Sequence, residues 1–221
     1  MNVLVIAPHA DDEILGVGAS MVKWIAEGHR VVVCIVTRGY EPIFKKELID
    51  QVLSEAKSCH EFLNISETIL LNFPAAALEM SSRSSLNEKL GDVVQKVKPE
   101  IVFIPHPGDM QKDHQMIAES AMVALRPKYQ HKVAAIYTYE TLSETEWNIP
   151  NVSNTFIPNV YNDVSDYIDI KIKAMNYYAS QLSDFPSPRS LQAIEALAKY
   201  RGSTVQVKAA EAFALVRQIM R

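Results

Sequence analysis

Short apolar segments that alternate with longer amphipathic segments restrict the fold of this sequence more than any other feature. Each apolar segment has the length and β-branched composition of a strand, and the segments between them repeat apolar residues at helical spacing. Strands are predicted at 2–7, 31–37, 67–71, 101–104 and 134–139, and helices at 13–26, 45–63, 85–97 and 114–125. Strands joined through helices form parallel sheets that are covered on both faces. We therefore predict a Rossmann-like, doubly wound α/β fold with a mostly parallel sheet.

The residues after 140 do not continue this alternation of strands and helices. Residues 141–158 are rich in Asn, Pro and Thr and predict an irregular surface excursion, whereas 164–182, 187–200 and 207–220 predict a helical C-terminal extension. The 221 residues contain no internal repeat and no low-complexity linker. A single domain that spans residues 1–221 is the simplest interpretation.

The charge and hydropathy of the sequence argue against nucleic acids and membranes as partners. The net charge is −4 and the basic residues are scattered, which argues against a nucleic acid or an anionic membrane surface as the main partner. No apolar run is long enough to span a bilayer, and the first residues do not form a secretory signal, so we expect a cytoplasmic protein without membrane insertion. Apolar stripes in the C-terminal extension leave room for a homo-oligomer.

Side chains that bind metal ions gather in the loops after the first and fourth predicted strands. They are His9, Asp11 and Asp12 in the first loop, and His106, Asp109, Asp113 and His114 in the second. In the common strand order 3-2-1-4-5 these two strands are neighbours, and their loops meet at the crevice where such sheets bind ligands. Two histidines and one carboxylate with an open coordination position form a known type of catalytic zinc site. The two loops together therefore predict a metal site.

Two other interpretations of the first loop compete with this one. Asp11 and Asp12 precede a predicted helix, where carboxylates also serve as N-terminal caps. A dinucleotide site would need glycines in this turn, but Gly16 and Gly18 lie inside the helix and the turn carries two carboxylates that would repel phosphate. Capping does not explain the matching residues in the second loop, so the metal site is favoured.

The motifs resemble those of the PIG-L/LmbE-like family of zinc-dependent N-deacetylases. Residues 8–13, Pro-His-Ala-Asp-Asp-Glu, match the family's Pro/Ala-His-Pro-Asp-Asp-Glu element except at Ala10, and residues 106–114 resemble its second element. Residues 37–39, Thr-Arg-Gly, resemble a further family segment. The tail resembles a bacterial subgroup associated with sugar modification through Ser180-Gln181, Pro188-Arg189-Ser190, Arg201-Gly202 and Ala210-Glu211-Ala212-Phe213.

The resemblance implies specific roles for residues of both loops. It implies one Zn²⁺ per chain, held by His9, Asp12 and His114, although the same ligands would also accept Fe²⁺. It also implies that Asp11 is the general base, which takes a proton from the attacking water and returns it to the leaving amine.

The sequence departs from the family at Gln111. Many members carry His-x-Asp-His in the second element, where the first His helps to stabilise the oxyanion, but residues 111–114 here are Gln-Lys-Asp-His. Glutamine donates an N–H hydrogen bond but cannot become cationic. Either Gln111 makes a neutral contact with the oxyanion, or another residue has taken over the role.

Several further residues are secondary candidates. We expect Arg38, Asp109 and Asp113 to contact substrate, although Arg38 could be a solvated strand end, and Asp113 could support a metal ligand or cap a helix. His106 is expected to have a structural or outer-pocket role and not to bind metal, and Arg189 and Glu211 are candidates for ion pairs in the pocket or between subunits. The histidines expected at the surface are His29, His60 and His131.

The expected reaction is hydrolysis of the N-acetyl amide of a small amino sugar, either a GlcNAc-like glycoside or a nucleotide sugar. It would release acetate and a free amine. One alternative is a metal-dependent deacylase or amidase that acts on a thiol conjugate or another small amide. A different class of alternative is a Rossmann-like binding protein whose metal has no catalytic role.

Overall fold

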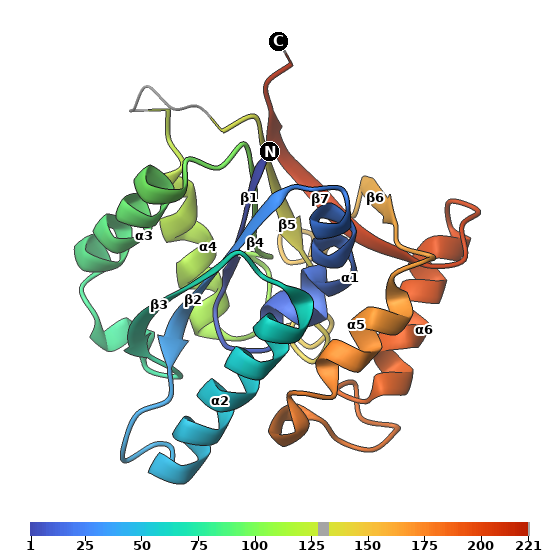
Figure 1. Ribbon diagram of the computed structural model, residues 1–221. Helices are drawn as coiled ribbons and strands as arrows, with labels where there is room; N and C mark the ends of the chain where they lie inside the picture. The colour runs from blue at the N-terminus through green and yellow to red at the C-terminus, as the bar shows by residue number, and fades with distance from the viewer. Residues whose placement is uncertain (128–132, 221) are drawn as a thin grey trace.

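The computed structural model describes residues 1–127 and 133–220, which contain a seven-stranded sheet in the order β3-β2-β1-β4-β5-β7-β6 (Figure 1). The strands are β1 (Asn2–Ala7), β2 (Arg30–Arg38), β3 (Glu67–Pro74), β4 (Ile101–Pro105), β5 (Ala135–Tyr139), β6 (Val160–Asp163) and β7 (Ala210–Gln218). Neighbours among the first five strands run parallel, and β7 runs antiparallel to β5 and β6. The predicted doubly wound α/β fold and its strand order are confirmed.

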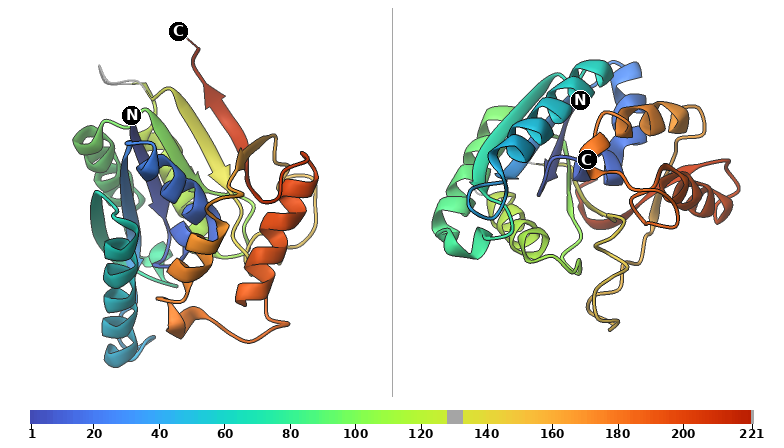
Figure 2. Two further views of the ribbon diagram at one scale, coloured as in Figure 1. Left: turned by 45° about the vertical axis from the view of Figure 1, so that its right-hand side comes forward. Right: turned by 90° about the horizontal axis from the view of Figure 1, so that it is seen from below.

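Helices cover both faces of this sheet (Figures 1 and 2). They are α1 (Asp12–Ala26), α2 (Lys46–Leu63), α3 (Arg83–Val97), α4 (Lys112–Ala124), α5 (Ile168–Met175) and α6 (Leu191–Ser203), with short 3₁₀ helices η1 (Leu78–Met80) and η2 (Ala179–Gln181). α3 and α4 lie against one face, and α1, α2 and α5 against the other. None of the helices in the described residues is long and apolar enough to cross a membrane.

The uninterrupted apolar composition of β1 follows from its central place. Val3 and Val5 pack into the core under α1 and α2, while Leu4 and Ile6 pack into the core under α3 and α4. A strand that is buried on both faces has no position for a polar side chain, which is why its sequence does not alternate. The first polar residues after β1 therefore appear where the strand leaves the sheet.

The C-terminal extension differs from the prediction. It contains α5 and α6, but the helix expected at 207–220 is wrong, because Ala210–Gln218 form strand β7. The helix-forming residues of this segment are overruled by pairing with β5, which would otherwise be an exposed edge, and by Phe213, whose ring lies 4.7 Å from that of Phe103. The short strand β6 beyond β7 was also not predicted.

A buried ion pair fixes α1 to this part of the sheet. Glu211 on β7 accepts hydrogen bonds from the backbone N–H groups of Ala19 (3.0 Å) and Ser20 (2.7 Å). Lys171 on α5 donates to Glu211 Oε1 (2.6 Å) and to the carbonyl oxygen of Leu15 (2.7 Å). Glu211, a candidate for an ion pair in the pocket or between subunits, thus pairs within the chain, away from the cavity described below. The pair thus holds the backbone of α1 at three residues and sets the position of the helix.

We expect the substitution Lys171→Met to destabilise the fold by about 3 kcal/mol, because it leaves the buried carboxylate of Glu211 without its cation. The measurement is urea unfolding followed by circular dichroism. The matched control is Lys199→Met, which breaks the exposed pair with Glu195 and should cost less than about 0.5 kcal/mol. Equal losses in the two variants would contradict the anchoring role of Lys171.

Candidate metal centre and active site

The turn after β1 carries three polar side chains, His9, Asp11 and Asp12, at the end of the strand. The backbone N–H and hydroxyl of Thr37 on β2 both donate to the carbonyl oxygen of Pro8, at 3.0 Å and 2.8 Å, and hold the turn against the sheet. Asp11 then adopts a φ of 130°, which is rare for a residue with a side chain, and its N–H donates to Glu13 Oε2 (3.0 Å). The strained position separates the directions of Asp11 and Asp12, so two adjacent carboxylates face different surroundings.

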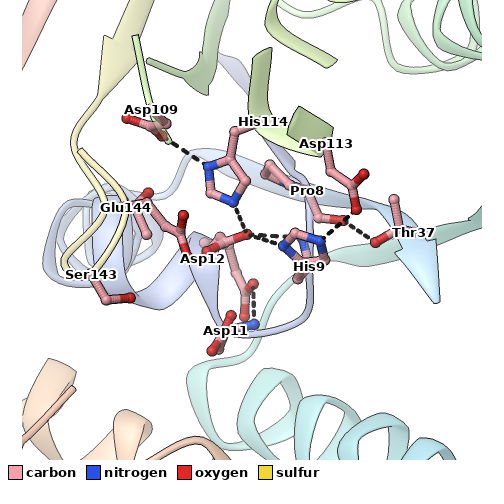
Figure 3. Close-up of polar contacts among 12 residues, drawn as sticks. Pro8, His9, Asp11, Asp12, Thr37, Asp109, Asp113, His114, Ser143 and Glu144 are labelled. Atoms are coloured by element: carbon pink, nitrogen blue, oxygen red, sulfur yellow. Dashed lines mark hydrogen bonds and ion pairs between the residues drawn. The ribbon is translucent and has the colours of Figure 1, made fainter. Parts of the chain in front are cut away.

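The structure brings His9, Asp12 and His114 together (Figure 3). Asp12 Oδ2 lies 3.1 Å from His9 Nδ1 and 3.2 Å from His114 Nε2, and one ligand atom of each residue lies within 4.8 Å of the others. His9 and Asp12 flank the turn after β1, and His114 lies in the first turn of α4, after β4. The adjacency of β1 and β4 is the reason that residues more than a hundred positions apart meet here.

Each histidine is held from behind by a carboxylate. His114 Nδ1 lies 2.8 Å from Asp109 Oδ2, and His9 Nε2 lies 3.0 Å from Asp113 Oδ2. Such partners fix the orientation of an imidazole and leave its other nitrogen free to bind a metal. The nitrogens that face Asp12 are therefore His9 Nδ1 and His114 Nε2.

The donor atoms of this cluster fit a metal ion. Asp12 Oδ1 is buried and makes no hydrogen bond with any residue that the structure describes, and His114 Nε2, also buried, has only its ion pair with Asp12. A buried carboxylate oxygen is rarely left without a partner, so Asp12 Oδ1 indicates that something else engages the cluster. Two imidazole nitrogens and a carboxylate oxygen suit a divalent transition metal and leave a coordination position open.

The carboxylates also set the charge of the cluster. Burial lowers the pKa of His9, but hydrogen bonds with Asp113 and Asp12 outweigh it and raise the pKa to about 9. Burial likewise opposes the charge of His114, yet Asp12 and Asp109 raise its pKa to about 10. Burial raises the pKa of Asp12, but the two histidines bring it well below its usual range. The centre is thus built to hold positive charge.

Asp109 and Asp113, expected as substrate contacts, are both paired with histidines of the cluster. Both oxygens of Asp109 are engaged, Oδ2 with His114 and Oδ1 with the hydroxyl of Thr145 (2.6 Å), and the side chain is fully buried. Asp113 accepts from His9 and from the backbone N–H of Ala76 (2.7 Å). Both carboxylates lie behind the histidines and outside the cavity lining, and we propose that they support the metal ligands there.

A cavity of about 340 Å³ opens onto the cluster. His9 and Asp11 reach it from the turn after β1, Arg38 from the end of β2, and Gln111 from the start of α4. Arg38 is partly exposed and lies 3.6 Å from Asp50, which places it at the rim. Asp12 and His114 are fully buried at the base of the turn.

Arg189 lines the cavity and contacts Asp11, the residue next to ligand candidate Asp12. Its guanidinium forms an ion pair with Asp11, its Nε donates to the hydroxyl of Ser143 (2.9 Å), and Glu144 lies 3.9 Å away. Burial raises the pKa of Asp11 to about 7, even though Arg189 lowers it. Arg189 was only a secondary candidate, because nothing in its own surroundings links it to a loop 178 residues earlier.

A buried hydrogen-bond network lies directly behind Asp11, and the sequence did not predict it. Glu13 accepts from the hydroxyl of Tyr178 (2.5 Å) and lies 3.2 Å from His60 Nε2. The expectation of a surface position for His60 is wrong, since its side chain is almost fully buried and its Nδ1 contacts Thr68. His131 lies outside the described residues.

His106 has the structural role expected of it. Its Nε2 lies 3.0 Å from the backbone oxygen of Asn154, and its ring meets the edge of Phe156. It therefore ties the excursion 141–158 to the end of β4. Asn148 adds to this by donating to the backbone oxygen of Gly108 (2.8 Å).

A family model described as PIG-L, GlcNAc-PI de-N-acetylase, matches residues 4–125. The match covers more than half of the chain and includes the loops after β1 and β4. The chain belongs to the PIG-L family. It is accordingly an N-deacetylase, an enzyme that hydrolyses an amide bond.

Relatives of this PIG-L protein support the assignment over most of its length. The deacetylase YaiS of Escherichia coli K12 is 27% identical over 185 residues, which are 81% of this chain and 91% of YaiS. Diacetylchitobiose deacetylase of Thermococcus kodakarensis is 24% identical over 83% of this chain and 71% of the relative. The crystal structure of the conserved protein TT1542 from Thermus thermophilus has a TM-score of 0.82 at 25% identity, with 100% of this chain and 97% of that chain covered.

We expect Asp109→Asn to lower the affinity for zinc about 10- to 100-fold, because the imidazole of His114 loses the carboxylate that orients it. The measurement is competition for the metal with a chromophoric chelator. Asp92→Asn is the control, since Asp92 is exposed on α3 and away from the cluster. Unchanged zinc affinity in a folded Asp109→Asn variant would contradict the supporting role of Asp109.

Proposed function

We propose that the chain is a zinc-dependent N-deacetylase of a small acetylated amino sugar. The observation that carries the proposal is the meeting of His9, Asp12 and His114 beside a cavity into which Asp11 also points. A sugar substrate is supported by the family description, which contains GlcNAc, and by the relative named for diacetylchitobiose. The acyl group is acetyl, and the product amine stays on the sugar.

We assign the metal ligands to His9 Nδ1, the Asp12 carboxylate and His114 Nε2. The assignment is supported by Asp109 and Asp113, which hold the other ring nitrogens and thereby decide which nitrogen faces the metal. When bound, a zinc ion would lower the pKa of a water molecule and polarise the amide carbonyl as a Lewis acid. Fe²⁺ would satisfy the same ligands.

Asp11 is assigned as the general base and acid. It is adjacent to ligand Asp12, but its side chain lines the cavity while Asp12 is fully buried. A carboxylate in this place accepts a proton from the attacking water and returns it to the amine nitrogen as the C–N bond breaks. The proton must reach the nitrogen because an amide anion is too poor a leaving group.

Gln111 and Arg189 also line the cavity, and we assign a role to each. Gln111 Oε1 is buried and has no hydrogen-bond partner in the described residues, and the same side chain carries two N–H donors that can contact a substrate carbonyl. Arg189 holds the carboxylate of Asp11 in one orientation and is itself held by Ser143. Arg38 at the rim is assigned to the sugar, where its guanidinium can donate to hydroxyl groups.

The experiment that tests the proposal is acetate release from a panel of N-acetylated sugars and non-sugar amides, with and without a chelator. We expect acetate from acetylated hexosamine derivatives, loss of activity with chelator, and recovery with added zinc. Cleavage of non-sugar amides alone would overturn the sugar substrate. Full activity in the chelated enzyme would overturn the metal dependence.

For Asp11→Asn we expect kcat to fall by at least about 100-fold while zinc content stays at the wild-type level, because the amide cannot accept the proton. The measurements are steady-state acetate release and metal analysis of the purified protein. The control for a lost carboxylate is Asp92→Asn, since Asp92 is exposed on α3 and does not line the cavity. A folded, zinc-loaded Asp11→Asn enzyme with full activity would disprove the assignment of Asp11.

For Arg189→Gln we expect kcat to fall about 10- to 100-fold, because a misplaced general base loses most of its effect. Arg201→Gln is the matched control, since Arg201 is similarly buried but pairs with Glu140 outside this cavity. Acetate release at saturating substrate is the measurement. A change in KM alone would show that Arg189 binds substrate and does not position Asp11.

A further inference from the structure

The cavity at the metal centre has two chemically different walls. One wall consists of apolar side chains from α2 and the segment that precedes it, among them Phe44, Leu48 and Val52. A second wall, from the C-terminal part of the chain, is mainly polar and carries Gln181 and Arg189, with Leu182 as an apolar member. The apolar wall is not explained by cleavage of an acetamide, since the reacting groups all lie on the polar side and at the turn after β1.

The apolar wall arises from the way α2 extends past the sheet. Leu48 and Val52, and likewise Ile49 and Leu53, are four positions apart and lie on successive turns of one side of the helix. The N-terminal turns of α2 project beyond the end of β2 (Figure 1), so no strand covers this stretch of the stripe. Leu48 is 38% exposed, whereas Ala56, further along the helix, is buried in the core.

Hydrogen bonds between α2 and η2 join the two walls. Glu55 on α2 accepts hydrogen bonds from the backbone N–H of Ser180 (3.1 Å) and from its hydroxyl (2.5 Å). Ser180 lies in η2, and the neighbouring Gln181 belongs to the polar wall. The cavity is therefore formed before a ligand enters, as small-molecule sites usually are.

The chemistry of the reaction decides which part of a substrate reaches the apolar wall. An N-deacetylase removes an acyl group with a single methyl carbon, which leaves nothing on the acyl side to cover a stripe of several apolar side chains. Sugar hydroxyl groups would lose hydrogen bonds with water against such a wall and find partners on the polar one. The apolar surface thus matches a group attached to the sugar on the amine side of the amide.

We propose that the substrate is an acetylated amino sugar with an apolar aglycone, which packs against the wall formed by Phe44, Leu48, Ile49, Val52 and Leu53. This inference rests on the proposed function. Each methylene group removed from water stabilises the complex enough to raise kcat/KM about three- to fourfold. The aglycone therefore sets substrate preference, while the acetamide sets the reaction.

The test compares alkyl glycosides of N-acetylglucosamine with methyl, butyl and hexyl aglycones. For the wild-type enzyme we expect kcat/KM for acetate release to rise at least tenfold from methyl to hexyl. A second arm lengthens the N-acyl group of the methyl glycoside from acetyl to butanoyl and hexanoyl, and here we expect no rise. A flat aglycone series, or a rise in the acyl series alone, would overturn the inference.

A substitution in the apolar wall tests whether this wall causes the dependence of kcat/KM on aglycone length. Leu48→Asn should reduce the chain-length dependence to a few-fold at most, because a polar side chain then faces the alkyl group. Leu70→Asn is the matched control, since Leu70 is 43% exposed on β3 and does not line the cavity. An unchanged chain-length dependence in Leu48→Asn would show that the alkyl group binds elsewhere and would contradict the proposal.

A binding measurement separates this inference from the proposed function. Hexyl and methyl glucosaminides lack the acetyl group, so calorimetry with the zinc-loaded enzyme reports their affinity without turnover. Tighter binding of the hexyl compound that Leu48→Asn abolishes supports the apolar site even if no sugar releases acetate. Acetate release from every glycoside with equal hexyl and methyl affinities would keep the proposed function and reject the apolar aglycone.

Discussion

The parallel pairing of β1 with β4 is the constraint on which the site depends. Val3, Leu4 and Val5 lie in register with Ile101, Val102 and Phe103, so the turns that follow the two strands meet at one edge of the sheet. His9 and Asp12 come from one turn and His114 from the other. Neither turn alone supplies all three residues of the cluster, and only the pairing of buried apolar strands places them within reach of one ion.

Most of the fold could be predicted from the sequence because its first five strands are short, rich in apolar residues and separated by amphipathic helices. Their order and direction follow from the rules of parallel sheets. β7 could not be predicted in this way, because Ala, Glu, Leu and Arg in 210–218 favour a helix locally and become a strand only through the edge of β5. The pairing partner that makes 210–218 a strand is found in the folded chain and cannot be inferred from the segment itself.

The three residues of the metal cluster could be predicted from the sequence, but the contacts around them could not. His9, Asp12 and His114 stand beside strand ends, where residue type and topology together indicate a metal site. The pairing of Asp109 with His114 and of Asp113 with His9 could not be predicted, because a sequence does not tell which side of a histidine a carboxylate will occupy. Arg189 and the buried position of His60 depend on distant segments that only the folded chain brings close.

The late position of β7 in the chain has a consequence for synthesis. A chain that emerges from the ribosome presents the turn after β1 first and Arg189 and Glu211 last. Until those residues appear, Asp11 has no guanidinium partner and α1 lacks the anchor on β7. The nascent protein can therefore form its two histidine loops before Arg189 pairs with Asp11 and before β7 enters the sheet between β5 and β6.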